Sequence, residues 1–288
     1  MAQTLAHNKH YRIATIPGDG IGPEVVESAV AIVQKLSQVL GTFSIEFAEL
    51  PWGTDYYKKT GRYMPADGLQ TLKQYDAILF DVPDHISLWG LLLAIRGPLQ
   101  QYANVRPVRA FPGIHTALRT DRDDDINWVI VRENSEGEYA GQGGRTHRDQ
   151  PWEIATDVAI FTRVGVERIM RFAFETARSR PRKLLTVVTK SNALRNGLVL
   201  WDEIADEVAR DFPDVMWDKV LVDAATIRMV RNPQSLDTIV GTNLHMDILS
   251  DLGAALAGSI GVAASSNLDP SRANPSLFEP VHVLAINV

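Results

Sequence analysis

The chain has 288 residues, of which 45% are hydrophobic, and this is enough to bury one large core or two linked cores. Its formal net charge of -6 and the lack of a basic run argue against a nucleic-acid partner. There is no cysteine, which excludes disulfides, thiolate catalysis and cysteine-ligated metals. We expect a cytoplasmic protein without a membrane partner, because no apolar run reaches the ~18 residues of a membrane helix and no signal-peptide core is present.

Strand-like and helix-like segments alternate through most of the sequence. The pattern predicts strands at 12–16, 44–50, 75–80, 105–110, 127–132, 183–189, 218–222 and 237–242. It predicts helices at 25–40, 66–74, 164–179 and 198–211, with one more after each of the last two strands. A glycine-rich turn, IPGDGIGPEV, joins the first strand to the first helix. This alternation is typical of an α/β fold with a largely parallel sheet.

The segment 136–162 interrupts this alternation. It has three glycines at a turn and then a β-rich stretch with five large apolar side chains, Trp152, Ile154, Val158, Ile160 and Phe161. We interpret the segment as a protruding hairpin or arm. Because such an arm would expose these side chains by itself, we expect it to pair with a second subunit.

Three aspartates are candidate metal ligands. Asp247 and Asp251 are four residues apart in a predicted helix, so both carboxylates project from one face, and Asp223 precedes another predicted helix. Mg²⁺ and Mn²⁺ prefer carboxylate oxygens and keep positions open for substrate and water. Taken alone, the pair fits a solvated surface helix better than a metal site.

Several other residues are candidates for binding and proton transfer. Arg96, Arg106 and Arg132 could hold the carboxylates of a small diacid, although each could also be an ordinary surface arginine. Lys190 ends a predicted buried strand, at the sheet edge where α/β folds place ligands, and is a candidate proton acceptor. Tyr139 is a candidate proton donor or a packing aromatic. The glycine-rich turn could bind phosphate, but a purely structural turn is the favoured interpretation.

Seven segments together resemble the β-decarboxylating dehydrogenases, the family of isocitrate, isopropylmalate, tartrate and D-malate dehydrogenases. In chain order they are IPGDGIGPEV (16–25), IRGPLQQYANVRP (95–107), RENSEGEYAG (132–141), TKSN (189–192), LVDA (221–224), TNLHMDILSD (242–251) and FEPVH (278–282). The resemblance covers nearly the whole chain. It implies a two-domain isopropylmalate-dehydrogenase-like α/β fold, with a mixed, largely parallel central sheet flanked by helices and a protruding dimerisation arm.

The resemblance also implies a division of the chain. Residues 1–101 with 259–288 would form a cofactor-side domain, and 102–258 a dimerisation and metal-site domain with its arm at about 136–162. The implied assembly is a homodimer whose active sites are shared between subunits.

Roles for single residues follow from the resemblance. Arg96, Arg106 and Arg132 should hold the substrate, and Asp247 and Asp251 should bind Mg²⁺ or Mn²⁺, with or without a monovalent cation. Lys190 and Asp223 should reach the site from the partner subunit, Lys190 to remove the hydroxyl proton and Asp223 also as a metal ligand. Tyr139 should protonate the enolate. Asn192, Glu279 and His282 should lie on the side of the NAD cofactor.

Substrate choice depends on PDHISLWGLLLAIR (83–96), which resembles the tartrate and D-malate enzymes, with Trp89 adding bulk near the substrate. We expect NAD- and metal-dependent oxidative decarboxylation of D-malate or tartrate. The alternatives are 3-isopropylmalate as substrate, a non-catalytic or regulatory member, and a metal-dependent lyase acting on a keto acid without hydride transfer.

The chain departs from the family pattern in two places. It passes directly from Phe80 to DVPDH, without the usual glycine-rich turn, and it reads VLAINV after FEPVH. The family continues there with an acidic residue for the adenosine ribose. We therefore expect the cofactor-side domain to be incomplete at its C-terminal end.

Overall fold

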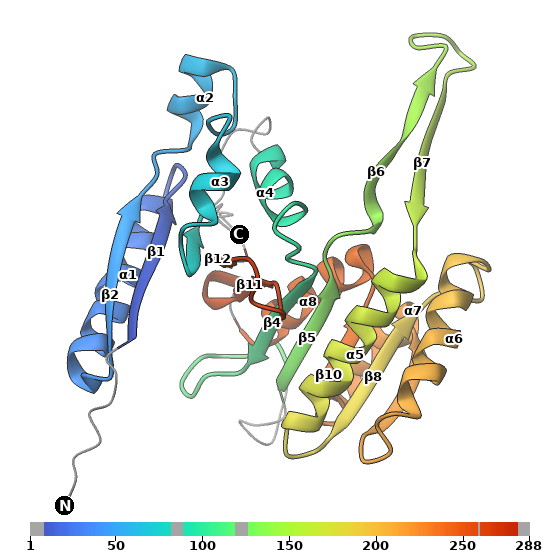
Figure 1. Cartoon of the computed structure of the whole chain (residues 1–288). Coiled ribbons are helices and arrows are strands. Elements are labelled where there is room, and N and C mark those ends of the chain that lie inside the picture. Colours follow the sequence, from blue (N-terminus) through green and yellow to red (C-terminus); the bar gives the residue numbers. More distant parts are fainter. Residues whose placement is uncertain (1–8, 82–88, 119–125, 259, 282–288) are drawn as a thin grey trace, which may run out of the picture. The chain divides into compact units, whose positions relative to one another are not determined.

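The computed structural model describes residues 9–81, 89–118, 126–258 and 260–281 (Figure 1). The chain divides into two compact units, Met1–Gln101 with Ser266–Val288, and Tyr102–Ser265. Within the described residues, no helix combines the length and the apolar character that crossing a membrane requires.

The first unit is built on parallel strands. Its elements are β1 (Lys9–Ile16), α1 (Gly22–Leu40), β2 (Phe43–Glu49), α2 (Thr54–Thr60), α3 (Gly68–Leu72), β3 (Ala77–Phe80), α4 (Trp89–Arg96) and β12 (Ser276–Pro280), with β11 (Ala264–Leu268) at the boundary. The strand order is β2-β1-β3-β12-β11, and β1 pairs in parallel with β2 and β3. Ile16, Ile78, Phe80 and Leu277 are buried in its core.

The second unit carries the remaining elements. They are β4 (Ala103–Arg109), β5 (Asn127–Glu133), β6 (Gly137–Thr146), β7 (Ile154–Ile160), α5 (Arg163–Ser179), β8 (Leu184–Thr189), α6 (Gly197–Ala209), β9 (Met216–Leu221), α7 (Val222–Arg231), η2 (Pro233–Ser235), β10 (Thr238–Gly241), α8 (Asn243–Leu256) and η3 (Ile260–Val262). The strand order is β4-β5-β10-β8-β9, antiparallel between β4 and β5 and parallel elsewhere. In Figure 1, α5 passes in front of these strands and α8 behind them.

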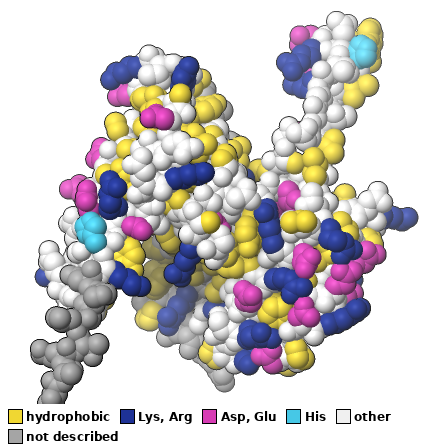
Figure 2. All heavy atoms as spheres, in the orientation of Figure 1, with side chains coloured by type: hydrophobic (Ala, Val, Ile, Leu, Met, Phe, Trp, Pro, Cys, Tyr) yellow, Lys and Arg dark blue, Asp and Glu magenta, His cyan; other side chains and the backbone are white. Residues whose placement is uncertain are grey.

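The segment 136–162 forms an antiparallel hairpin, as predicted (Figure 1). All seven residues of β7 are exposed, and Trp152 beside it is 61% exposed. Apolar side chains are visible along the hairpin in Figure 2. At Gly143 a Cβ would lie 2.0 Å from the carbonyl oxygen of Thr156, so only glycine allows the two strands to approach this closely. Pairing of this arm with a second subunit stays a prediction.

The α/β fold with a mixed, mostly parallel sheet is confirmed. Every predicted strand and helix is found, with shifts of a few residues at the ends, although α3 is shorter than the predicted 66–74. Sequence reasoning missed α2, β11 and β12. None of the residues of α2 is buried, and β11 (ASSNL) is mostly polar, so neither shows the apolar periodicity that reveals an element.

Candidate active site

The candidate site in the second unit is built around the first turns of α8. Thr242 is the N-cap, and its hydroxyl accepts a hydrogen bond from the backbone N–H of His245 at 3.3 Å. From this fixed start, Asn243, Asp247 and Asp251 follow at intervals of four residues and share one face of the helix. The two carboxylate side chains are 35% and 38% exposed.

Two buried arginines face the aspartates from the sheet. Arg132, near the end of β5, donates from Nε (2.9 Å) and Nη2 (2.7 Å) to Oδ1 of Asn243 and from Nη1 to Oδ1 of Asp247. Arg106, on β4, lies 3.6 Å from carboxylate oxygens of both Asp247 and Asp251. The antiparallel pairing of β4 with β5 brings the two arginines to the same helix.

Arg106 is held in place by neutral partners. Its Nε donates to Oδ1 of Asn104 at 3.0 Å, and its Nη1 donates to Oγ of Ser250 at 2.6 Å. The guanidinium therefore has a fixed orientation before any ligand arrives. A fixed, buried guanidinium is suited to recognising a carboxylate.

Tyr139, on β6, completes this cluster. Its hydroxyl donates to Oδ2 of Asp247 at 2.9 Å, and its ring lies 5.3 Å below the guanidinium carbon of Arg132. Asp247 is thus contacted by Arg106, Arg132 and Tyr139. The pair of aspartates does not merely solvate a surface helix, because both members are paired with buried cations.

Lys190 and Asp223 form a second cluster. Lys190 follows β8, Asp223 lies in the first turn of α7, and Nζ donates to Oδ1 at 2.5 Å. The hydrogen bond from Lys190 is the main cause that lowers the pKa of Asp223. Among the described residues no three carboxylates or imidazoles converge as a metal site, so Asp223 does not join Asp247 and Asp251 within one chain. Asn192 is exposed in the turn after Lys190.

His245 lies next to the second cluster. Burial lowers its pKa, the charge of Glu138 opposes this shift and that of Lys190 adds to it. Its Nδ1 is buried and has no hydrogen-bond partner within the described parts of the chain. Glu138 also accepts hydrogen bonds from the hydroxyl of Thr242 at 2.9 Å and from the N–H of Leu244 at 3.2 Å. The beginning of α8 is therefore attached to the base of the arm.

The other predicted site residues belong to the first unit. Arg96 is the last residue of α4 and is buried, and Glu279, on β12, accepts a hydrogen bond from Asn267 at 2.7 Å. Trp89 begins α4, but its side chain lies outside the described residues, as does His282. The short connection after Phe80 falls at 82–88, which is also outside them.

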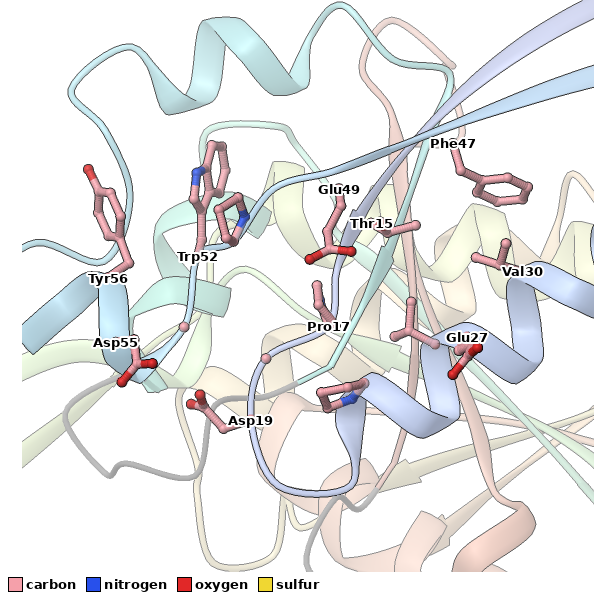
Figure 3. A pocket seen from close by; sticks show the side chains of 15 residues that line it. Thr15, Pro17, Asp19, Glu27, Val30, Phe47, Glu49, Trp52, Asp55 and Tyr56 are labelled. Atoms are coloured by element: carbon pink, nitrogen blue, oxygen red, sulfur yellow. The ribbon is translucent and has the colours of Figure 1, made fainter.

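The glycine-rich turn borders a cavity of about 640 Å³ in the first unit (Figure 3). Gly18 and Gly20 have φ of 64° and 58°, and Asp19 between them accepts hydrogen bonds from the N–H (3.1 Å) and hydroxyl (2.5 Å) of Thr54. None of the 15 residues that line the cavity is basic, and four are acidic, Asp19, Glu27, Glu49 and Asp55. This charge would repel phosphate, so the favoured interpretation as a structural turn agrees with the geometry.

Sequence reasoning missed the neutral residues that hold the arginines. These residues are Asn243, Ser250 and Asn104. Asn243 could have been found, because it precedes Asp247 by four residues and so lies on the same helix face. Asn104 lies two residues before Arg106 on β4, so the period of a strand places both side chains on one face.

In the second unit of this α/β fold, two arginines and two aspartates meet beside a helix N-terminus, and this set of charges suits a small anionic ligand together with a cation. Comparison with known proteins identifies the family. The family model described as isocitrate/isopropylmalate dehydrogenase matches residues 12–286, and the chain belongs to this family. It is therefore a decarboxylating dehydrogenase by family.

Similar proteins carry consistent names. A "Probable tartrate dehydrogenase/decarboxylase" of Agrobacterium vitis is 60% identical over 286 residues, covering 97% of this chain and 80% of that protein. The D-malate dehydrogenase (decarboxylating) of Escherichia coli is 46% identical over 282 residues, covering 95% and 78%. Among solved structures, isocitrate dehydrogenase from Methylococcus capsulatus superposes with a TM-score of 0.83 at 36% identity, covering 94% and 77%.

Proposed function

We propose that this chain oxidatively decarboxylates a small 2-hydroxy diacid, D-malate or tartrate, using NAD and Mg²⁺ or Mn²⁺. The observation that carries the proposal is the pairing of Arg106 and Arg132 with Asp247 and Asp251. Two cations and two anions balance in this cluster. A divalent cation and a dianionic acid also balance, so both can enter together, the cation at the aspartates and the carboxylates at the arginines.

The donor set fits a hard divalent cation. Asp247 and Asp251 present oxygen ligands from one helix face, and Mg²⁺ is commonly held by one or two carboxylates with the other positions taken by substrate and water. We propose that the partner subunit's Asp223 supplies a further ligand. When bound, the metal would polarise the substrate oxygens, and NAD would accept the hydride.

The protein's own residues would orient the acid and move protons. Arg106 and Arg132, together with Arg96, would hold the carboxylates by charge-assisted hydrogen bonds. The partner subunit's Lys190 would accept the hydroxyl proton in its neutral form, oriented by its contact with Asp223. Tyr139 would donate the proton that the enolate needs after CO₂ has left.

The remaining assignments extend the same proposal. Asn192, Glu279 and His282 would lie beside the cofactor, and Trp89 beside the substrate. A homodimer would form through the arm 136–162, whose strand β7 is exposed along its whole length. The unit Met1–Gln101 with Ser266–Val288 would serve the cofactor, and Tyr102–Ser265 the metal and the dimer.

The test is steady-state turnover of D-malate, tartrate and 3-isopropylmalate with NAD⁺ and Mn²⁺, followed by NADH absorbance. We expect the two C4 acids to be preferred, because the relatives that are 60% and 46% identical are named as tartrate and D-malate enzymes. A clear preference for 3-isopropylmalate would contradict the substrate, and CO₂ release from oxaloacetate as the sole activity would favour a lyase. No turnover of any acid would contradict the whole proposal.

A further inference from the structure

Asp202, on α6, is a buried carboxylate that the proposed chemistry does not use. Only 7% of the residue is exposed, and its neighbours Trp201, Ile204 and Ala205 are fully buried. Its Oδ2 accepts hydrogen bonds from the hydroxyl of Ser191 at 2.7 Å and from Nζ of Lys219 at 2.8 Å. The other oxygen, Oδ1, is buried with no partner within the described residues.

Burial of this carboxylate calls for an explanation other than stability. Taking a charge out of water costs free energy, and a buried ion pair is often no more stabilising than apolar side chains of the same size. Asp202 is also only partly satisfied, because both of its donors meet at one oxygen. A role in placing the residues that it contacts accounts for this buried, partly satisfied carboxylate better than a role in the core.

The contact between Asp202 and Ser191 leads to Lys190. Ser191 lies between Lys190 and Asn192 in the turn that joins β8 to α6 (Figure 1). Lys190 in turn contacts Asp223, which follows β9, and Lys219 is on β9 itself. Asp202 thus connects one helix to the turn that carries Lys190 and to the strand that leads to Asp223.

We propose that Asp202 is a positioning residue, which through Ser191 and Lys219 holds Lys190 against Asp223 in the geometry that proton transfer requires. This inference rests on the role proposed above for Lys190. A rigid helix is suited to positioning Lys190, because a displacement of about 1 Å in a catalytic group can lower the rate on the order of 100-fold.

The test compares Ser191→Ala, Ser191→Thr and Asp202→Asn in the full chain. Ser191→Ala removes the contact, and we expect kcat to fall by about 10- to 100-fold while KM stays within about threefold. Ser191→Thr keeps the hydroxyl and should restore most of kcat. Asp214→Asn, which removes an exposed partner of Lys183, is the matched control and should leave kcat unchanged.

A second measurement does not depend on activity. Lysines are acylated briefly in the absence of substrate, and modification of Lys190 is quantified by peptide mass spectrometry relative to Lys183. In Ser191→Ala and Asp202→Asn we expect Lys190 to react several-fold faster, because its turn is released from α6. Wild-type kcat and wild-type labelling in both variants would overturn the inference. Full activity of Lys190→Met would instead contradict the proposed function, while the labelling would still test the placement.

Discussion

The hydroxyl of Tyr139 donates to Oδ2 of Asp247 at 2.9 Å, from a hairpin strand to a helix 108 residues further along the chain. The other oxygen of the same carboxylate is contacted by Arg132 and Arg106. The carboxylate of Asp247 is therefore contacted by the proposed proton donor and by two residues that are proposed to bind the substrate. A cation bound at Asp247 would compete for these contacts. We therefore expect metal binding, substrate binding and the position of the Tyr139 hydroxyl to depend on one another.

Replacing Asp247 with asparagine removes a negative oxygen ligand from the candidate metal site. We expect the affinity for Mn²⁺ to fall by about 10-fold or more, since charge is the main attraction for a hard cation. Electron paramagnetic resonance of free Mn²⁺ measures this without turnover. Equal affinities in the variant and the wild type would place the metal elsewhere, and Asp214→Asn provides the control for loss of a surface carboxylate.

Tyr139→Phe keeps the ring over Arg132 and removes only the hydroxyl. If Tyr139 donates the proton to the enolate, kcat should fall by about 100-fold or more, the usual contribution of general acid catalysis. Thermal unfolding should change little, because the residue is 42% exposed. A kcat within about twofold of wild type would rule out the hydroxyl as the proton donor.

Arg132→Lys keeps the charge and loses the fork of donors that spans Asn243 and Asp247. We expect KM for the diacid to rise by about tenfold or more, equivalent to about 1.4 kcal/mol, because an ammonium cannot contact a carboxylate in the same bidentate way. Steady-state kinetics at saturating NAD⁺ and Mn²⁺ measures this. An unchanged KM would show that Arg132 only supports α8.

Sharing of sites between subunits can be tested with two inactive variants. Lys190→Ala keeps Asp247, and Asp247→Asn keeps Lys190, so a mixed dimer has one site with both lesions and one with neither. We expect a purified mixed dimer, made with two affinity tags, to regain about half of the wild-type activity by this symmetry argument. Mixed dimers that stay inactive would show that Lys190 serves the site of its own chain.

Asp214 should contribute to the pH dependence of stability. Hydrogen bonds from Lys183 and then Arg178 lower the pKa of Asp214 from 3.8 to about 2. Since this folded-state pKa is depressed, the stabilisation is complete above the unfolded value and is lost as the pH falls from 3.8 towards 2. Urea unfolding across this range should show wild type and Asp214→Asn converging. A constant difference between them would contradict the assignment.

One part of the candidate site could be predicted because its residues are close in sequence. The four-residue spacing of Asp247 and Asp251 predicts one helix face, and α8 places them so. The hairpin could be predicted because a glycine-rich turn adjoins an apolar stretch. The contact between Asp202 and Ser191 could not be predicted, because no sequence periodicity relates a helix residue to the turn that precedes the helix.

The sequence by itself determined most of the order of strands and helices, the family and the face of α8 that carries the carboxylates. These follow from local periodicity and from motifs, which act over a few residues. The tertiary structure decided that Arg106 and Arg132 pair with those carboxylates, and that Asp223 pairs with Lys190 rather than joining them in one chain. Such contacts join residues far apart in sequence, so they exist only after the strands have paired and the helices have packed against them.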